Sequence, residues 1–135
     1  MAKVSMSTQL GTSADEAWKM IGGFNALPDW HPAVEASELT EEGQTRTLSL
    51  VGGGQIVEKL EKIDNRARTY TYSIKNSPLP VANYTSTITV REEDGGCVVD
   101  WSGEFDAMGG ETEASDIVTG IYQAGLDNLK KMFGG

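Results

Sequence analysis

The chain contains few of the residues from which metal and redox centres are built. Its 135 residues include a single cysteine, Cys97, and a single histidine, His31. One cysteine excludes an intrachain disulfide, and one histidine excludes most zinc sites, which commonly use two. No group of cysteine and histidine residues has metal-ligand spacing, so we expect neither a metal nor a cofactor.

Positive charge is also scarce, with 11 lysine and arginine residues against 20 aspartate and glutamate residues and a net charge of −9. Nucleic acids and anionic membrane surfaces attract basic proteins, so we expect no nucleic-acid partner. No apolar run is long enough to span a bilayer, and residues 1–10 (MAKVSMSTQL) lack the apolar centre of a secretion signal. Together with the lone cysteine, these features predict a cytoplasmic protein without membrane insertion.

The length favours one domain covering residues 1–135, which is large enough to bury a core without disulfides. Ser13 is a candidate N-cap for a first short helix, with Glu16 completing a capping box, and a second short helix or turn is expected within residues 24–32. Apolar residues at helical spacing predict a long helix over roughly 114–133. Period-two alternation predicts strands at residues 3–10, 34–39, 45–51, 55–63, 68–74, 84–91 and 98–105.

The order of these elements predicts an α+β fold. One strand and two short helices are followed by six strands and a long helix, and consecutive strands with short turns favour an antiparallel meander. A single long helix cannot cover both faces of a sheet, so we expect a curved sheet of about seven strands wrapped around the C-terminal helix. Such a wrap leaves a hollow between helix and sheet, where ligand sites are common.

The segment NSPLPVANYTSTITV (76–90) is the most informative part of the chain. A loop with Pro78 and Pro80 leads into an alternating strand, and one face of that strand begins with Tyr84 and Ser86 rather than with aliphatic residues. This pattern predicts a strand that lines a cavity, with the loop at the cavity mouth. An ordinary proline-containing hairpin is the alternative.

Alternation also predicts which side chains face the helix. On residues 45–51 and 55–63, the aliphatic positions place Arg46 and Glu58 on the inner face, and buried charges require partners, so we expect the two to interact. That pair is either a self-contained internal salt bridge or a polar anchor for a ligand carboxylate, hydroxyl or carbonyl. The predicted ligand-binding residues are His31, Arg46, Leu48, Glu58, Tyr70, Tyr72, Tyr84, Ser86 and Trp101, with Ile117 and Ile121 from the helix.

Two residues are candidates for acid–base chemistry. His31 lies in Asp29-Trp30-His31-Pro32, where a histidine is either a capping or surface residue or an acid, base or donor at the cavity rim. Glu58 is the other candidate, because it is a carboxylate expected inside the cavity.

Five segments together resemble the SRPBCC superfamily of START-like, helix-grip proteins, in its polyketide cyclase/dehydrase and lipid-transport branch. The segments are residues 13–34, 45–64, 77–90, 98–105 and 124–132, and the resemblance spans essentially the whole chain. It implies a curved antiparallel sheet that grips a long C-terminal helix around an elongated hydrophobic cavity.

Plant abscisic-acid receptors belong to this superfamily, and the resemblance to them implies two gate loops and a role for Glu58 in binding. The chain departs from the receptors because its first loop is a run of glycines rather than S-G-L-P, and because no lysine lies near His31. Hormone perception is therefore not expected, whereas a gated cavity is. The predicted gate residues are Gly52, Gly53, Gly54, Pro78, Leu79 and Pro80.

Three functions remain open from the sequence. The first is binding of a small hydrophobic or amphipathic molecule in the cavity, by a monomer or a homodimer. The second is a cyclase- or dehydratase-type enzyme that uses the same cavity to place a flexible substrate. The third is an accessory protein that binds another protein, which exposed aromatic side chains would favour.

Overall fold

The computed structural model describes residues 2–134, so Met1 and Gly135, the two ends of the predicted domain, lie outside the described residues. The elements follow one another in the expected order. They are β1 (Ala2–Leu10), α1 (Ala14–Ile21), α2 (Leu27–Trp30), β2 (Val34–Thr40), the 3-10 turn η1 (Glu41–Gly43), β3 (Thr45–Leu50), β4 (Gln55–Asp64), β5 (Thr69–Asn76), β6 (Val81–Glu93), β7 (Gly96–Ala107) and α3 (Glu111–Phe133).

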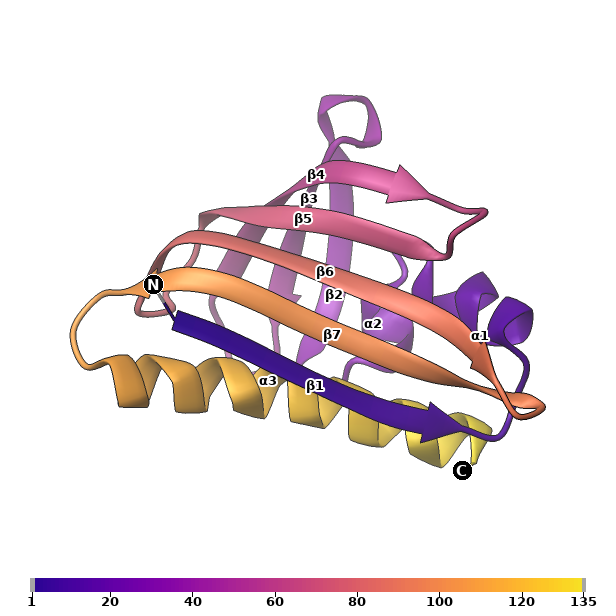
Figure 1. Cartoon of the computed structure of the whole chain (residues 1–135). Coiled ribbons are helices and arrows are strands. Elements are labelled where there is room, and N and C mark those ends of the chain that lie inside the picture. The colour runs from indigo at the N-terminus through magenta and orange to yellow at the C-terminus, as the bar shows by residue number, and fades with distance from the viewer. Residues whose placement is uncertain (1, 135) are drawn as a thin grey trace.

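The strands form one seven-stranded sheet in the order β1-β7-β6-β5-β4-β3-β2, and every neighbouring pair is antiparallel. Figure 1 shows the sheet curving over α3, with α1 and α2 at one end of the molecule. This arrangement confirms the expected α+β helix-grip fold. Because β1 pairs with β7, the first strand forms the edge of the sheet beside the C-terminal helix.

The first helix begins as the sequence predicts, but its capping box is incomplete. The Glu16 backbone N–H donates to Ser13 Oγ at 3.2 Å, which satisfies one of the free N–H groups of the first turn. The Glu16 carboxylate instead accepts from Lys19 Nζ at 3.0 Å, on the solvent side of the helix. Gly22 follows the last residue of α1 and caps it through a backbone bond to Trp18 O.

The starts of α3 and β6 differ most from the sequence expectation. The last helix begins at Glu111 rather than near residue 114, because its first turn is acidic and exposed and has no apolar pattern to reveal it. Negative charges in that turn suit the positive end of the helix dipole. Strand β6 begins at Val81, so the proline loop contains only residues 77–80.

The core lies between the concave face of the sheet and α3, where α3 packs against β1 and β7. Leu126, Leu129 and Phe105 are fully buried there, and Val4 adds to the contact from β1. Among residues 2–134, none of the helices combines the length and apolarity that a bilayer crossing requires.

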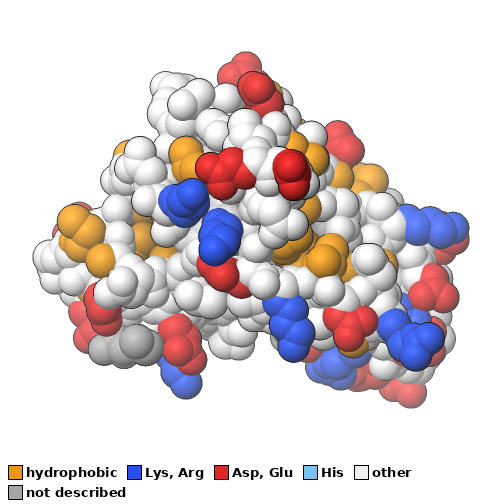
Figure 2. Space-filling view, turned by 90° about the horizontal axis from the view of Figure 1, so that it is seen from above, with side chains coloured by type: hydrophobic (Ala, Val, Ile, Leu, Met, Phe, Trp, Pro, Cys, Tyr) orange, Lys and Arg blue, Asp and Glu red, His pale blue; other side chains and the backbone are white. Residues whose placement is uncertain are grey.

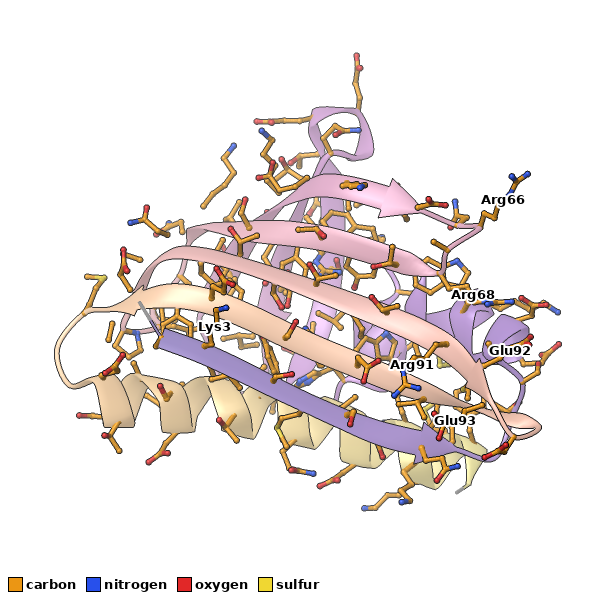
Figure 3. All side chains as sticks on the ribbon, viewed as in Figure 1. Lys3, Arg66, Arg68, Arg91, Glu92 and Glu93 are labelled. Atoms are coloured by element: carbon orange, nitrogen blue, oxygen red, sulfur yellow. The ribbon has the colours of Figure 1, made fainter. Side chains whose placement is uncertain are left out.

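The outer surface of the molecule carries charges of both signs. Figure 2 shows acidic and basic side chains interspersed on the side opposite α3, with apolar side chains between them. At the α1 end, Arg68 and Glu92 lie close together (Figure 3), with 3.6 Å between Arg68 Nη2 and Glu92 Oε1. The same Arg68 nitrogen lies 2.9 Å from Asp15 Oδ1, which ties α1 to the sheet.

Candidate functional site

A cavity of about 260 Å³ lies between α3 and the half of the sheet that contains β3, β4 and β5. Most of its wall is aliphatic or aromatic, which is usual for sites that take small organic molecules. The predicted ligand-binding residues that line it are His31, Leu48, Glu58, Tyr72, Tyr84, Trp101, Ile117 and Ile121; the other lining residues are Leu27, Ala33, Val34, Leu50, Val51, Gly53, Ile56, Ile74 and Leu79.

Three of the predicted ligand-binding residues do not line the cavity. Arg46, Tyr70 and Ser86 are almost completely buried, and they lie behind the wall rather than in it. Alternation placed them on the inner face of the sheet, where they are. Alternation gives no information about how deeply a side chain is buried, and here neighbouring side chains separate these three residues from the cavity.

The two predicted gate loops lie beside each other, next to the cavity. Gly52, Gly53 and Gly54 all have positive φ angles, a conformation that glycine adopts without strain. A Cβ atom at position 54 would lie 4.0 Å from Pro78 Cγ, so the glycine loop rests against the proline loop. One residue of each loop, Gly53 and Leu79, reaches the cavity wall.

Glu58 places a carboxyl group in the cavity wall, and behind the wall it forms the expected ion pair with Arg46, the residue opposite it on β3. Arg46 Nε and Nη2 lie 2.8 Å and 2.7 Å from the same atom, Glu58 Oε1. Arg46 Nη1 donates to the backbone oxygen of Phe24 at 2.6 Å, and the guanidinium also lies over the Phe24 ring. The arginine is therefore held by the segment that connects α1 and α2 as well as by the sheet.

Burial and charge act in opposite directions on this pair. Burial alone would lower the pKa of Arg46, but Tyr70 and Glu58 beside it more than offset burial and raise the pKa. Burial raises the pKa of Glu58, and the charge and hydrogen bonds of Arg46 oppose that rise. Arg46 is therefore always charged, while Glu58 is a carboxyl group whose proton affinity is increased by its surroundings.

A second cluster of polar side chains links β5, β6, β7 and α3 through hydrogen bonds to hydroxyls. Trp101 Nε1 donates to Tyr72 OH and to Ser86 Oγ, both at 3.1 Å. Ser86 Oγ also lies 2.7 Å from the hydroxyl of Tyr122, which in turn is hydrogen-bonded to the hydroxyl of Tyr84. The Trp101 and Tyr122 rings are stacked with centroids 4.4 Å apart, so this hydrogen-bonded group is also tightly packed.

These tyrosines stay protonated at neutral pH. Burial raises the pKa of Tyr72 and of Tyr84 well above the usual value, and nearby tyrosine hydroxyls add to the shift. Burial also raises the pKa of Tyr122, to about 12. Each hydroxyl therefore acts as a hydrogen-bond donor and acceptor rather than as a base.

His31 lines the cavity with its ring, but both of its nitrogens are engaged by the protein. The backbone N–H of Ala33 donates to Nδ1 at 3.2 Å, so Nδ1 carries no proton. Nε2 lies 2.7 Å from the backbone oxygen of Ile121, an acceptor only, so Nε2 carries the proton. Burial lowers the pKa of His31, the bond to Ile121 opposes this, and the charge of Arg46 adds to the lowering. His31 is thus a neutral link between the α2–β2 connection and α3.

The family model described as "Polyketide cyclase / dehydrase and lipid transport" matches residues 1–134. The chain belongs to this family. This membership confirms the resemblance of the sequence to the START-like SRPBCC superfamily.

Three relatives show how far the similarity of this family member extends. The protein XoxI from Bacillus cereus is 43% identical, with a TM-score of 0.97, and the match covers 98% of this chain and 96% of that one. An uncharacterized protein from Bacillus thuringiensis is 44% identical, with a TM-score of 0.95 and 98% of each chain covered. The MLP-like protein 423 of Arabidopsis thaliana is 25% identical over 126 residues, which cover 84% of this chain and 81% of that protein.

Two residues at the site, Tyr122 and Gly103, have roles that the sequence did not reveal. Tyr122 is recognisable in the sequence as part of the apolar stripe of α3, but nothing local shows that its hydroxyl joins the Ser86 group. A Cβ atom at Gly103 would overlap that hydroxyl, so only glycine lets Tyr122 reach the sheet. At Gly125, a Cβ atom would lie 2.7 Å from His31 Cδ2 and 2.9 Å from Trp101 Cζ3, so glycine is required for the histidine to approach α3.

Proposed function

We propose that residues 1–135 form a single START-like domain that binds a small, mainly apolar molecule with one polar end. The observation that carries this proposal is the cavity itself, an apolar space of about 260 Å³ with the buried carboxyl of Glu58 in its wall. A buried polar group inside an apolar wall is the usual means of orienting a ligand. Membership in a family described by polyketide cyclases, dehydrases and lipid transport supports the same function.

The size of the cavity limits the ligand. A volume of about 260 Å³ lies just below the usual range of about 300–1,000 Å³ for pockets that hold small molecules, so a compact one- or two-ring compound fits better than a long acyl chain. Entry and release would use the contact between the glycine loop 52–54 and the proline loop 77–80. Transport of a full-length lipid would require these loops to separate.

The binding proposal is tested by filling the cavity. Ile117→Trp places a larger side chain on α3 at a position that lines the cavity, whereas Met132→Trp makes a similar change on the same helix away from it. Native mass spectrometry after purification, followed by a thermal-shift screen of small aromatic compounds, should show ligands bound to the wild type and to Met132→Trp, and not to Ile117→Trp. Equal binding by all three proteins would contradict the proposal.

A second function, proton transfer on a bound substrate, is favoured by one observation. Glu58 lines the cavity, and burial raises the pKa of its carboxyl group above the usual value, which favours proton exchange with a bound substrate. With a cyclase or dehydratase substrate, Glu58→Gln should abolish turnover while retaining binding. Absence of turnover across a polyketide and aromatic panel would leave binding as the function.

Exposed aromatic side chains would favour the accessory-protein interpretation. The exposed large hydrophobic residues in the described part of the chain are aliphatic: Leu39, Val51, Ile63, Met108, Ile117 and Met132. A cytoplasmic location and the oligomeric state stay predictions.

A further inference from the structure

One oxygen of Glu58 is unused by the protein. Both bonds from Arg46 end on Oε1, and neither the hydrogen bonds nor the ion pairs of residues 2–134 involve Oε2. The only buried polar side-chain atom without a partner in this part of the chain is Trp30 Nε1, so Oε2 is not sealed in the core. Since Glu58 is 5% exposed and lines the cavity, Oε2 is accessible from the cavity as a hydrogen-bond acceptor.

The arginine of the pair, by contrast, cannot serve a ligand. Its Nε and Nη2 are directed at Glu58, its Nη1 is directed at the Phe24 carbonyl, and the rings of Phe24 and Tyr72 lie 4.2 Å and 5.1 Å from its central carbon. None of the described residues that line the cavity is a lysine or an arginine. An anionic ligand would therefore lose its hydration beside a carboxylate without gaining a cation, which is unfavourable.

The hydrogen bonds among the hydroxyls around Ser86 have a fixed direction. Ser86 Oγ donates to the Ser102 carbonyl at 2.9 Å, because a carbonyl only accepts. Ser86 therefore accepts from Tyr122, and Tyr122, having used its proton, accepts from Tyr84.

Tyr72 is the remaining hydroxyl of this group. It accepts from Trp101 Nε1, and within 3.5 Å its own proton has no acceptor among the described residues; the neighbouring Tyr84 hydroxyl is the group that competes with a ligand for it. Tyr72 lines the cavity on β5, and Glu58 lies on the same face of the neighbouring strand β4, where it pairs with Ile74, two residues from Tyr72. Such diagonal neighbours lie within reach of one small ligand group.

We infer that the cavity selects a neutral hydroxyl compound, a phenol or an alcohol with a compact apolar body, over a carboxylate. The ligand hydroxyl donates to Glu58 Oε2 and accepts from the Tyr72 hydroxyl, while the apolar body lies against Leu48, Ile56 and Ile121. This inference rests on the proposed binding function and specifies its ligand. Glu58 and Tyr72 are then the residues that determine specificity.

The test compares three probes with the same ring system by isothermal titration calorimetry. These are 2-naphthol, 2-methoxynaphthalene, which accepts but cannot donate, and 2-naphthoate, which is an anion. The expected result is that 2-naphthol binds the wild type at least about tenfold more tightly than either of the others, the size of effect expected from a hydrogen bond to a charged acceptor. Ile117→Trp should bind none of the three.

Two variants test how Glu58 and Tyr72 contribute to the preference for 2-naphthol. In Glu58→Gln, the preference for 2-naphthol over 2-methoxynaphthalene should fall to about twofold or less. In Tyr72→Phe, both compounds should weaken by a similar few-fold factor, because both accept from that hydroxyl, so their ratio should persist. Tyr72→Phe keeps the Arg46–Glu58 pair, so it remains informative if Glu58→Gln does not fold.

The possible outcomes distinguish a wrong ligand preference from a failure of cavity binding itself. Equal binding of 2-naphthol and 2-methoxynaphthalene to the wild type, or tighter binding of 2-naphthoate, overturns the inference and leaves cavity binding intact. A naphthol-to-ether ratio that collapses in Tyr72→Phe also overturns it, because Glu58 would then not be the selective group. If the wild type binds none of the three, the proposed function and this inference fail together.

Discussion

The two halves of the sheet meet α3 in different ways although both show the same alternation of inner and outer side chains. Strands β1 and β7 pack directly on α3, and Phe105 of β7 and Leu126 of α3 are almost completely buried in this part of the core. Strands β3, β4 and β5 stand away from the helix, and six of their inner side chains border the cavity instead: Leu48, Leu50, Ile56, Glu58, Tyr72 and Ile74. The packed half supplies most of the close contact with α3, whereas the open half is available for a ligand.

This comparison predicts that equivalent truncations on α3 have unequal effects. Leu126→Ala, in the packed half, should lower the free energy of unfolding by about 3 kcal/mol or more, because it leaves a new void in a filled core. Ile121→Ala, in the open half, should cost about 2 kcal/mol or less, because it extends a space that already exists beside a partly buried residue. Urea denaturation of the two variants measures the difference. Equal losses would mean that the two halves are packed alike.

Two glycines of α3 test how closely the helix approaches the neighbouring side chains. Gly125→Ala would press a methyl group against His31, Trp101 and Trp30, and overpacking should outweigh the better helix propensity of alanine, for a net loss of about 1 to 2 kcal/mol. Gly120→Ala meets nothing within 4 Å and should instead stabilise the protein by up to about 1 kcal/mol. Thermal denaturation of the pair should shift the Tm in opposite directions, and shifts of the same sign would refute the close approach at Gly125.

The smallest expected effect is the pH dependence that His31 contributes. Because burial lowers the pKa of His31 in the folded state, the unfolded chain takes up a proton first as the pH falls. The contribution of His31 to stability is therefore complete above about pH 6.5 and decreases below it, by at most about 1.4 kcal/mol per pH unit, until the folded pKa is reached.

The variant His31→Gln keeps an N–H that can donate to the Ile121 carbonyl but removes the titration. Urea denaturation of both proteins between pH 7.5 and pH 5 should show a steeper loss for the wild type. The carboxyl groups titrate in both proteins and cancel in the difference. Parallel profiles would show that His31 is not held in its neutral form.

Much of the fold followed from patterns that are local in the chain. The alternating segments became strands, Ser13 became an N-cap, and the proline loop separates β5 from β6. The start of α3 was missed because the turn at Glu111 is exposed and has no apolar periodicity. Helix ends of this kind are set by dipole and solvent effects, which an apolar pattern does not record.

The candidate site was predictable only in part, and Arg46 and Glu58 show why. Alternation placed both on the inner face and predicted that they pair, as they do. It could not predict that the carbonyl of Phe24, a residue 22 positions away, would hold the arginine behind the wall and leave only the glutamate facing the cavity. Likewise, the hydroxyl of Tyr122 reaches Ser86 only because residue 103, on another element, is glycine.

Local patterns along the chain predicted the order and type of the elements, the antiparallel sheet around a C-terminal helix and the family, because alternation, turn residues and helical spacing are properties of neighbouring residues. The place of the cavity, the inner polar groups that face it and the free oxygen of Glu58 became visible only in the folded chain. Whether a side chain faces inward depends on its position within one strand. Exposure to a cavity depends on the curvature of the sheet and on the distance to α3, which distant parts of the chain set together.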